Sequence, residues 1–163
     1  MKSRTGRIFR LLAMAVTVLL VGSARAGDGT PGSAERGRYL VIVANCVGCH
    51  TASFRVLDGN VAEDSWFTGS PLGFRSQIGT TYAPNLRLFF QELSEEGWLN
   101  LVRTTTYRRP MPWWSLREMT DQDLLAVYRY VRGMGAKGDR APTFLPPGQE
   151  PPQPYIDLPA SPS

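Results

Sequence analysis

Residues 46 to 50 read Cys46-Val47-Gly48-Cys49-His50, and they hold both cysteines and the one histidine of this 163-residue chain. The C-x-x-C-H spacing is the signature of c-type haem attachment. Two thiols with this spacing reach the two vinyl groups on one porphyrin edge, while the adjoining imidazole turns under the ring to bind iron. The pentapeptide therefore predicts one covalent haem c, held by Cys46, Cys49 and His50.

Three other interpretations of the pentapeptide were weighed against haem attachment. A redox-active disulfide between Cys46 and Cys49 would need a thioredoxin-like βαβ context, whereas the segment before Cys46 has a helical pattern. A zinc site uses four ligands, and two cysteines with one histidine fall at least one short unless a carboxylate joins them. Chance would have to gather every cysteine and histidine of the chain in five consecutive residues. Haem attachment is the favoured interpretation.

The iron of such a haem has a sixth coordination position, and the chain has no second histidine to fill it. A methionine thioether is the obvious ligand, and His/Met ligation raises the reduction potential. Met111 is the strongest candidate, because a proline on each side stiffens an extended loop that can present the thioether. Met119 and Met134 lie at opposite ends of a predicted helix, and core packing is the alternative role for all three. We expect His50 and Met111 to bind the iron.

The N-terminus has the order of a secretory signal peptide. A basic stretch is followed by an apolar run from Leu11 to Val21 and then by the small-x-small sequence Ala24-Arg25-Ala26. Eleven apolar residues are too few for a comfortable membrane span, although an uncleaved N-terminal anchor is the alternative. The sequence therefore predicts a cleaved signal peptide at residues 1–26 and a periplasmic location.

Removal of residues 1–26 changes the charge of the chain. Five of the 18 basic residues and none of the 14 acidic residues lie there, so 13 basic and 14 acidic residues remain, a formal charge of −1. The basic character of the whole chain therefore belongs to the predicted leader. No nucleic-acid partner is expected.

Helical periodicity marks three segments of the remaining chain. Ser33 is expected to cap a helix that runs straight into Cys46, a second helix is expected over 94–105, and a third over 121–132 after a capping box at Thr120. Residues 51–92 carry many glycines and prolines without a sustained period, which predicts a long loop wrapped around the haem.

Apolar residues within 51–92 leave two questions open. Trp66, Phe67, Phe74 and Tyr82 are expected either to cover the haem or to belong to the ordinary core. The apolar run 86–90 is a candidate for local packing or for a partner contact, and packing is favoured because most apolar clusters are core.

Eight of the 27 residues from Lys137 onward are proline, which prevents a helical ladder. One interpretation is a disordered tail. The other is an extended strap that packs on the domain or docks a partner, with Phe144, Tyr155 and Ile156 as apolar anchors. The expected organisation is a signal peptide at 1–26, a haem domain at 27–136 and a Pro-rich extended tail at 137–163.

These residues resemble the class I c-type cytochromes, and more closely the haem domains of bacterial membrane-associated alcohol and aldehyde dehydrogenase cytochrome subunits. Only the pentapeptide is highly specific alone. Those subunits commonly carry three haem motifs, so this chain is similar to a single domain of them. The resemblance covers about residues 34–134 and rests on Gly37-Arg38-Tyr39-Leu40, residues 46–52, residues 79–85, Trp98, Met111-Pro112 and residues 126–131.

The resemblance implies an all-α, class I cytochrome c-like fold in which the first and last helices cross around one covalent haem. Gly37 would give the close approach at the crossing, and Val127 and Tyr130 would pack near it. The same resemblance supports His50 and Met111 as the axial pair.

The expected function is periplasmic one-electron transfer between a dehydrogenase donor and an oxidase or cytochrome acceptor of the respiratory chain, without catalysis by this chain. One alternative is a haem sensor or enzyme with an open distal site, although the lack of a second histidine argues against peroxidase chemistry. Another is a fixed electron-relay subunit, associated with the membrane through a larger complex. Arg108 and Arg109 are read either as a docking patch for an acidic partner or, more simply, as solvated surface.

Overall fold

The computed structural model describes residues 30–160 of the chain. The predicted signal peptide and the last three residues of the predicted tail lie outside this range. Within the range, no helix combines the length and the apolar character needed to cross a membrane.

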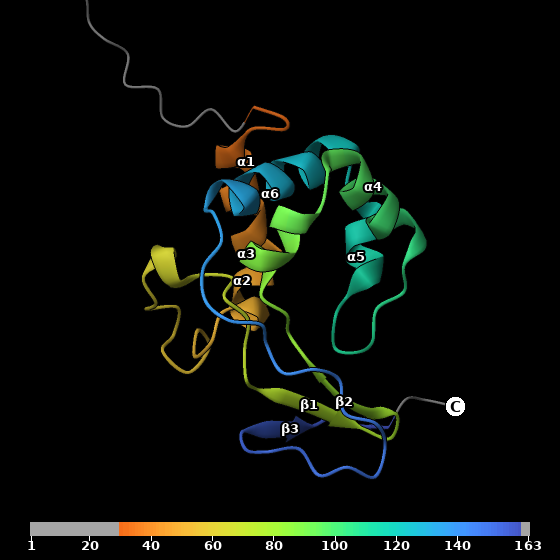
Figure 1. The fold of residues 1–163 in the computed structure, drawn as a ribbon. Helices are drawn as coiled ribbons and strands as arrows, with labels where there is room; N and C mark the ends of the chain where they lie inside the picture. The colour runs from red at the N-terminus through yellow and green to blue at the C-terminus, as the bar shows by residue number, and fades with distance from the viewer. Residues whose placement is uncertain (1–29, 161–163) are drawn as a thin grey trace, which may run out of the picture.

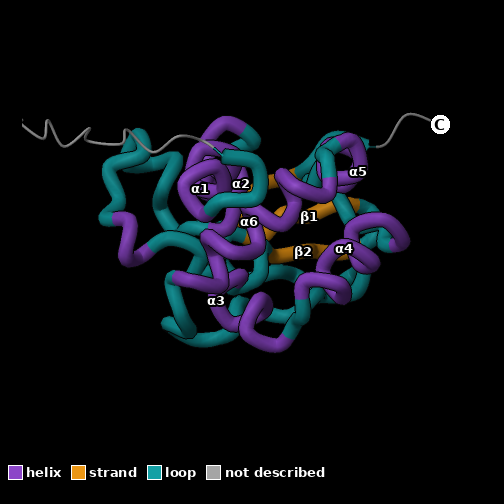
Figure 2. Tube along the Cα trace, turned by 90° about the horizontal axis from the view of Figure 1, so that it is seen from above, coloured by secondary structure: helices purple, strands orange, loops and turns teal. Residues whose placement is uncertain are grey.

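Helices gather at one end of the molecule and a small sheet lies at the other (Figure 1). Viewed from above, β1 and β2 lie beneath the helices (Figure 2). Two short 3₁₀ turns, Glu63–Ser65 and Phe90–Glu92, complete the regular structure of residues 30–160. In chain order the other elements are α1 (Ala34–Val43), α2 (Cys46–His50), β1 (Gly73–Ser76), β2 (Gly79–Tyr82), α3 (Leu86–Phe89), α4 (Glu95–Thr104), α5 (Trp113–Glu118), α6 (Asp121–Gly133) and β3 (Tyr155–Asp157).

The sheet contradicts the all-α prediction. Its strand order is β2-β1-β3, with β1 antiparallel to β2 and parallel to β3. Gly73 of β1 therefore lies opposite Tyr82 on one side and Tyr155 on the other. The expected long loop at 51–92 is wrong for the same reason, because it contains β1, β2, α3 and both 3₁₀ turns. Strands of three or four residues are too short to show an alternating pattern in the sequence.

The three predicted helices are present, the caps expected at Ser33 and Thr120 are observed, and Ser94 caps the second helix. The hydroxyls of Ser33, Ser94 and Thr120 each accept a hydrogen bond from the backbone N–H three residues later, at 3.1, 3.0 and 3.1 Å. Each cap satisfies one of the N–H groups that the first helical turn leaves without a partner. The second and third helices keep their predicted bounds to within one residue.

Helices α1 and α6 pack closely, and Gly37 makes this approach feasible. A Cβ atom built on Gly37 would lie 2.0 Å from the carbonyl oxygen of Ala126 and 2.8 Å from the Cβ of Tyr130. The close approach expected at Gly37 is therefore observed. Around it, α1 and α6 contribute the fully buried side chains of Val41, Leu124 and Val131 to the core.

The apolar run 86–90 packs inside the molecule at its C-terminal end. Phe90 is only 1% exposed, and its ring centroid lies 4.9 Å from that of Trp98 and 5.5 Å from that of Tyr128, both with edge-to-face geometry. Trp66 and Phe67 are also buried in the same core. The packing interpretation of the run 86–90 therefore holds at Phe90.

Glu63 links the 3₁₀ turn 63–65 to α1 and α6. Its carboxylate accepts hydrogen bonds from Arg38 at 2.8 Å and from the Tyr130 hydroxyl at 2.6 Å. These two donors stabilise the charged form, so the pKa of Glu63 lies below its ordinary value of 4.5.

Replacing Glu63 with Gln is expected to remove a pH-dependent part of the stability. A carboxyl with a lowered folded pKa stabilises the fold above its unfolded pKa, and this contribution disappears as the pH falls through the folded pKa. Because Arg38 and Glu63 are both half-exposed, the free energy of unfolding of wild type should exceed that of Glu63→Gln by only about 0.5 kcal/mol at pH 7. Near pH 3 the two free energies should not differ measurably. Urea unfolding of both proteins across that range measures the difference. A gap that is independent of pH would contradict the assignment.

The Pro-rich segment 137–160 forms an extended strap that packs on the domain, which is the second of the two interpretations considered above. Near its start, the Asn85 amide donates to the carbonyl oxygens of Lys137 and Asp139 at 2.8 and 3.0 Å. Further along, Leu145 pairs with Thr80 on the free edge of β2, and β3 then adds to the opposite edge of the sheet. We call residues 137–160 the strap.

Candidate haem site

Cys46, Cys49 and His50 lie together on α2, a helix of a single turn or so. The predicted helix from Ser33 does not run into it, because α1 ends at Val43 and Asn45 adopts a left-handed φ of 56°. The pentapeptide therefore forms a separate short helix, which a turn at Asn45 divides from α1. A local break of this kind leaves little trace in a hydrophobic pattern, since Asn tolerates left-handed backbone and also occurs in helices.

The two thiols are free and half-buried, and no disulfide joins them. Burial raises the pKa of the Cys46 thiol to about 11. Cys49 accepts a hydrogen bond from the guanidinium of Arg55, with 3.2 Å between Nη2 and Sγ. Both sulfurs are thus free thiols on one helical turn, which is what thioether formation with a porphyrin requires.

The imidazole of His50 is buried and held by one backbone group. Its Nδ1 lies 2.9 Å from the carbonyl oxygen of Pro84, which can only accept, so Nδ1 carries the proton and Nε2 keeps its lone pair. Burial lowers the pKa of His50, which favours the neutral ring. A neutral imidazole whose second nitrogen is oriented by a carbonyl is the usual form of a histidine metal ligand.

The carbonyl of Pro84 is itself fixed by its neighbour. The side chain of Asn85 caps α3 by accepting from the N–H of Leu88 at 3.0 Å, and the same amide donates to the strap. On the other side, the backbone carbonyl of His50 accepts from the N–H of Gly69 at 2.9 Å. Sequence reasoning assigned no role to Pro84 or Asn85, because a backbone carbonyl carries no residue-type signal and the contact spans 34 residues.

Met111 lies in a different part of the chain from α2. It lies in the loop 105–112 between α4 and α5, and it is half-buried against the edge of the core. Figure 1 shows this loop and α2 on opposite sides of the segment that joins β2 to α3. Met119 and Met134 are half-buried against the same core. The structure therefore gathers three of the four expected haem residues on one helix and places the fourth on a separate loop.

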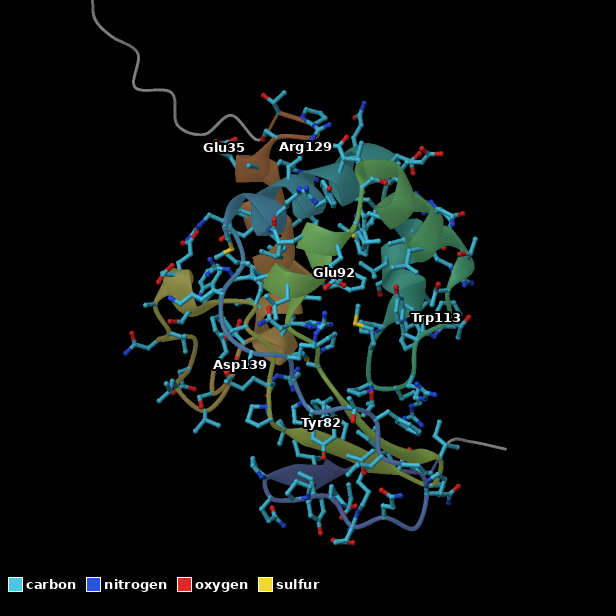
Figure 3. All side chains as sticks on the ribbon, viewed as in Figure 1. Glu35, Tyr82, Glu92, Trp113, Arg129 and Asp139 are labelled. Carbon is cyan, nitrogen blue, oxygen red and sulfur yellow. The ribbon has the colours of Figure 1, made fainter. Side chains whose placement is uncertain are left out.

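The short helix α5, which the sequence analysis missed, begins directly after this loop. The rings of Trp113 and Trp114 meet edge-to-face, with 5.7 Å between their centroids. The guanidinium carbon of Arg117 lies 4.4 Å from the ring centroid of Trp113. Figure 3 shows Trp113 on the loop side of α5 and Tyr82 at the sheet. Arg117 also donates to the carbonyl oxygen of Thr105 at 3.2 Å, which ties α5 to the start of the loop.

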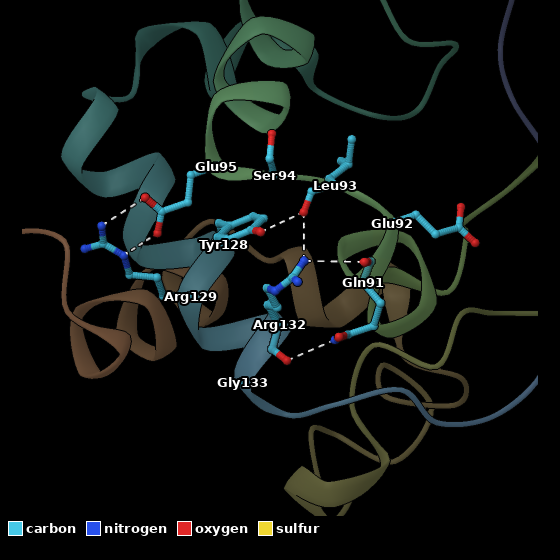
Figure 4. Close-up of a pocket in the computed structure, with 9 residues that line it drawn as sticks. All are labelled: Gln91, Glu92, Leu93, Ser94, Glu95, Tyr128, Arg129, Arg132 and Gly133. Carbon is cyan, nitrogen blue, oxygen red and sulfur yellow. Dashed lines mark hydrogen bonds and ion pairs between the residues drawn. The ribbon is translucent and has the colours of Figure 1, made fainter.

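A surface cleft between α6 and the start of α4 contains none of the four expected haem residues (Figure 4). Its polar groups are engaged with one another: Arg129 pairs with Glu95 at 2.8 Å, and Tyr128 and Arg132 both donate to the carbonyl oxygen of Leu93 at 2.7 Å. These contacts join α4 to α6, so the cleft has a structural explanation.

Three known proteins resemble the chain. The fructose dehydrogenase cytochrome subunit of Gluconobacter japonicus is 28% identical over 140 residues, which are 77% of this chain and 28% of that protein. The alcohol dehydrogenase (quinone) cytochrome c subunits of Gluconacetobacter polyoxogenes and Komagataeibacter europaeus are each 32% identical over 124 residues, 69% of this chain and 24% of theirs. The chain is related to dehydrogenase cytochrome subunits.

This chain spans about a quarter of the length of these cytochrome subunits. No model of a protein family matches it. No solved structure matches it significantly.

The residues around α2 fit a haem group. Cys46 and Cys49 supply two free thiols, and His50 supplies an oriented, neutral imidazole beside them. The buried hydroxyl of Tyr82, at the end of β2, has no hydrogen-bond partner among the described residues. The fit of a haem therefore rests on the two thiols and the imidazole of α2.

Proposed function

We propose that this chain is a periplasmic electron-transfer protein or subunit with one covalent haem c. Cys46 and Cys49 would form the thioether links, and His50 and Met111 would be the axial ligands of the iron. The observation that carries this proposal is the 2.9 Å contact from His50 Nδ1 to the carbonyl oxygen of Pro84, which aims a neutral imidazole for metal binding in a buried setting. The related dehydrogenase cytochrome subunits support the electron-transfer role.

A haem bound here would supply the one-electron chemistry, as its iron alternates between the ferric and ferrous states. The work of the chain is to hold and tune that group. The Pro84 carbonyl draws on the Nδ1 proton of His50 and so makes Nε2 a stronger donor. At the edge of the core, the half-buried side chains of Phe54 and Val61 pack against the buried cluster that includes Trp66.

The partners follow from the same reasoning. An electron carrier needs a donor and an acceptor, and we propose a periplasmic dehydrogenase for the first and an oxidase or cytochrome of the respiratory chain for the second. Association with a membrane would come through such a complex. No step of this function breaks a bond in a substrate, so the chain acts as an electron-transfer component and not as a catalyst.

Met111→Ala is expected to abolish the weak red charge-transfer absorption band of ferric iron bound to a thioether. The loss follows because Met111 is the proposed source of the sulfur ligand. Its backbone is fixed on both sides, since its N–H donates to the carbonyl oxygen of Arg108 and its carbonyl oxygen accepts from the N–H of Trp113. Absorption spectra of the purified holoprotein in both oxidation states measure the band.

Met119→Ala is the matched control, because Met119 is also half-buried against the core. It should keep the band. If wild type lacks the band and binds carbon monoxide readily, the haem has an open distal site, and a sensor or enzyme function replaces electron transfer.

A further inference from the structure

The strap contacts the loop that carries Met111 at two points. The guanidinium carbon of Arg108 lies 4.0 Å from the ring centroid of Phe144. Next to it, Nη1 of Arg109 donates to the carbonyl oxygen of Pro159 at 3.5 Å. Both arginines therefore meet the strap, which neither of the roles considered for them from the sequence included. A guanidinium over an aromatic face is an attractive, directional contact.

Phe144 packs closely against the hairpin of β1 and β2. A Cβ atom on Gly79 would lie 2.6 Å from Cζ of Phe144 and 2.3 Å from the carbonyl oxygen of Leu145, so the strap lies directly on the Gly79 backbone. Leu145 and Thr80 exchange two backbone hydrogen bonds of 2.9 and 3.0 Å. The ring that Arg108 touches is thus attached to β2 by regular backbone pairing.

The other end of the strap is anchored to β1. Residues 155–157 pair with 73–75, and the N–H of Leu158 donates to the carbonyl oxygen of Arg75 at 2.8 Å. The side chain of Arg75 also pairs with Asp157 and Glu150. These ion pairs are exposed and individually weak, so the backbone pairing carries most of the attachment.

The same hairpin leads into the segment that holds His50. Tyr82 ends β2, and Pro84 follows two residues later with the carbonyl that accepts from His50 Nδ1. The strap pairs with β2, and β2 leads to the Pro84 carbonyl that contacts His50. Through Phe144 the strap also contacts Arg108, on the loop that carries Met111. Through β2, the strap thus connects the segment whose Pro84 carbonyl orients His50 with the loop that carries Met111.

We propose that the strap is a positioning element for the loop 105–112, with Phe144 as the positioning residue that keeps Met111 on the iron. This inference rests on the proposed ligation by Met111. Exchange of that ligand requires the loop to swing away, and the contact of Arg108 with Phe144 stabilises the closed arrangement. A competing ligand binds only the open form, so its apparent affinity reports the open fraction.

Imidazole titration of the ferric holoprotein tests the proposal, because imidazole competes with Met111 for iron. Phe144→Ala should lower the apparent dissociation constant for imidazole by roughly three- to tenfold, in proportion to a lost cation–π contact and its packing. Ile156→Ala is the matched control: it truncates an exposed strap residue of β3. It should leave the constant unchanged.

A double-variant comparison separates positioning from a general loss of structure. In a Met111→Ala background the sixth position is already open, so adding Phe144→Ala should have no further effect on imidazole binding. Two milder substitutions remove the same cation–π contact. Phe144→Leu removes the ring but keeps an apolar side chain against Gly79, and Arg108→Gln removes the guanidinium but keeps the ring. Each of these two substitutions, made in the wild-type protein, should lower the apparent dissociation constant for imidazole by about two- to fivefold. Either can replace Phe144→Ala if that variant does not fold.

The outcomes are distinct. An unchanged dissociation constant in all three contact variants overturns the positioning role, as does an equal shift in the Met111→Ala background. If Met111→Ala itself leaves imidazole affinity at the wild-type value, the assignment of Met111 as ligand fails, and the positioning role fails with it.

Discussion

Replacing both Cys46 and Cys49 with serine is expected to give a protein that loses all of its haem on denaturation. Thioether bonds are the one link that survives unfolding, because the bond from iron to His50 depends on the folded arrangement in which Pro84 orients the ring. A haem stain after denaturing electrophoresis measures retention: wild type should stain at the position of the chain, and the double variant should not stain.

The single variants provide the control for this experiment. Cys46→Ser and Cys49→Ser each keep one sulfur, so each should retain part of the haem in covalent form. Retention by the double variant would show that Cys46 and Cys49 are not the attachment points, and a wild type that releases all its haem would show that the attachment is not covalent. Either result would remove the central element of the proposed function.

Gly37→Ala is expected to destabilise the holoprotein by at least about 3 kcal/mol, which is the upper range for overpacking a close contact. The added methyl group would lie 2.0 Å from the carbonyl oxygen and 2.5 Å from the carbonyl carbon of Ala126. Those atoms belong to the backbone of α6 and cannot rotate away, so the two helices have to separate. Urea unfolding at neutral pH measures the loss.

Gly133→Ala makes the same chemical change at the end of α6, where an added Cβ meets nothing within 4 Å. It should be neutral or stabilise the protein by up to about 1 kcal/mol, through helix propensity. If the two variants lose equal stability, the close approach at Gly37 does not limit the packing of α1 on α6.

Local signals account for the parts of the fold that were predicted well. Ser33, Ser94 and Thr120 cap the three predicted helices through bonds to residues three positions away, and such bonds depend only on nearby sequence. The close approach at Gly37 was expected from a family resemblance, since no local pattern shows which residue of α6 faces it.

Long-range pairing accounts for the parts that were missed. The parallel partner of β1 is β3, about 80 residues later in the chain, and each strand has at most four residues. Neither partner shows an alternating pattern, so both were read as loop or tail. The helix α5 was missed because it has only six residues and follows a proline-rich stretch.

The candidate site divides in the same way. Cys46, Cys49 and His50 could be named from the sequence, because haem attachment requires these residue types at this spacing within one turn of chain. The contact of His50 with Pro84, and that of Arg108 with Phe144, join segments more than 30 residues apart. Only the folded chain reveals such pairs.

By itself, the sequence determined which residues are the candidates for haem attachment and where the main helices lie, since both depend on side chains that are close along the chain. The tertiary structure decided whether the Pro-rich segment is a tail or a strap. Proline removes backbone donors and prevents an internal ladder, so this segment makes its regular backbone pairing with β1 and β2. The same pairing brings it against the loop of Met111.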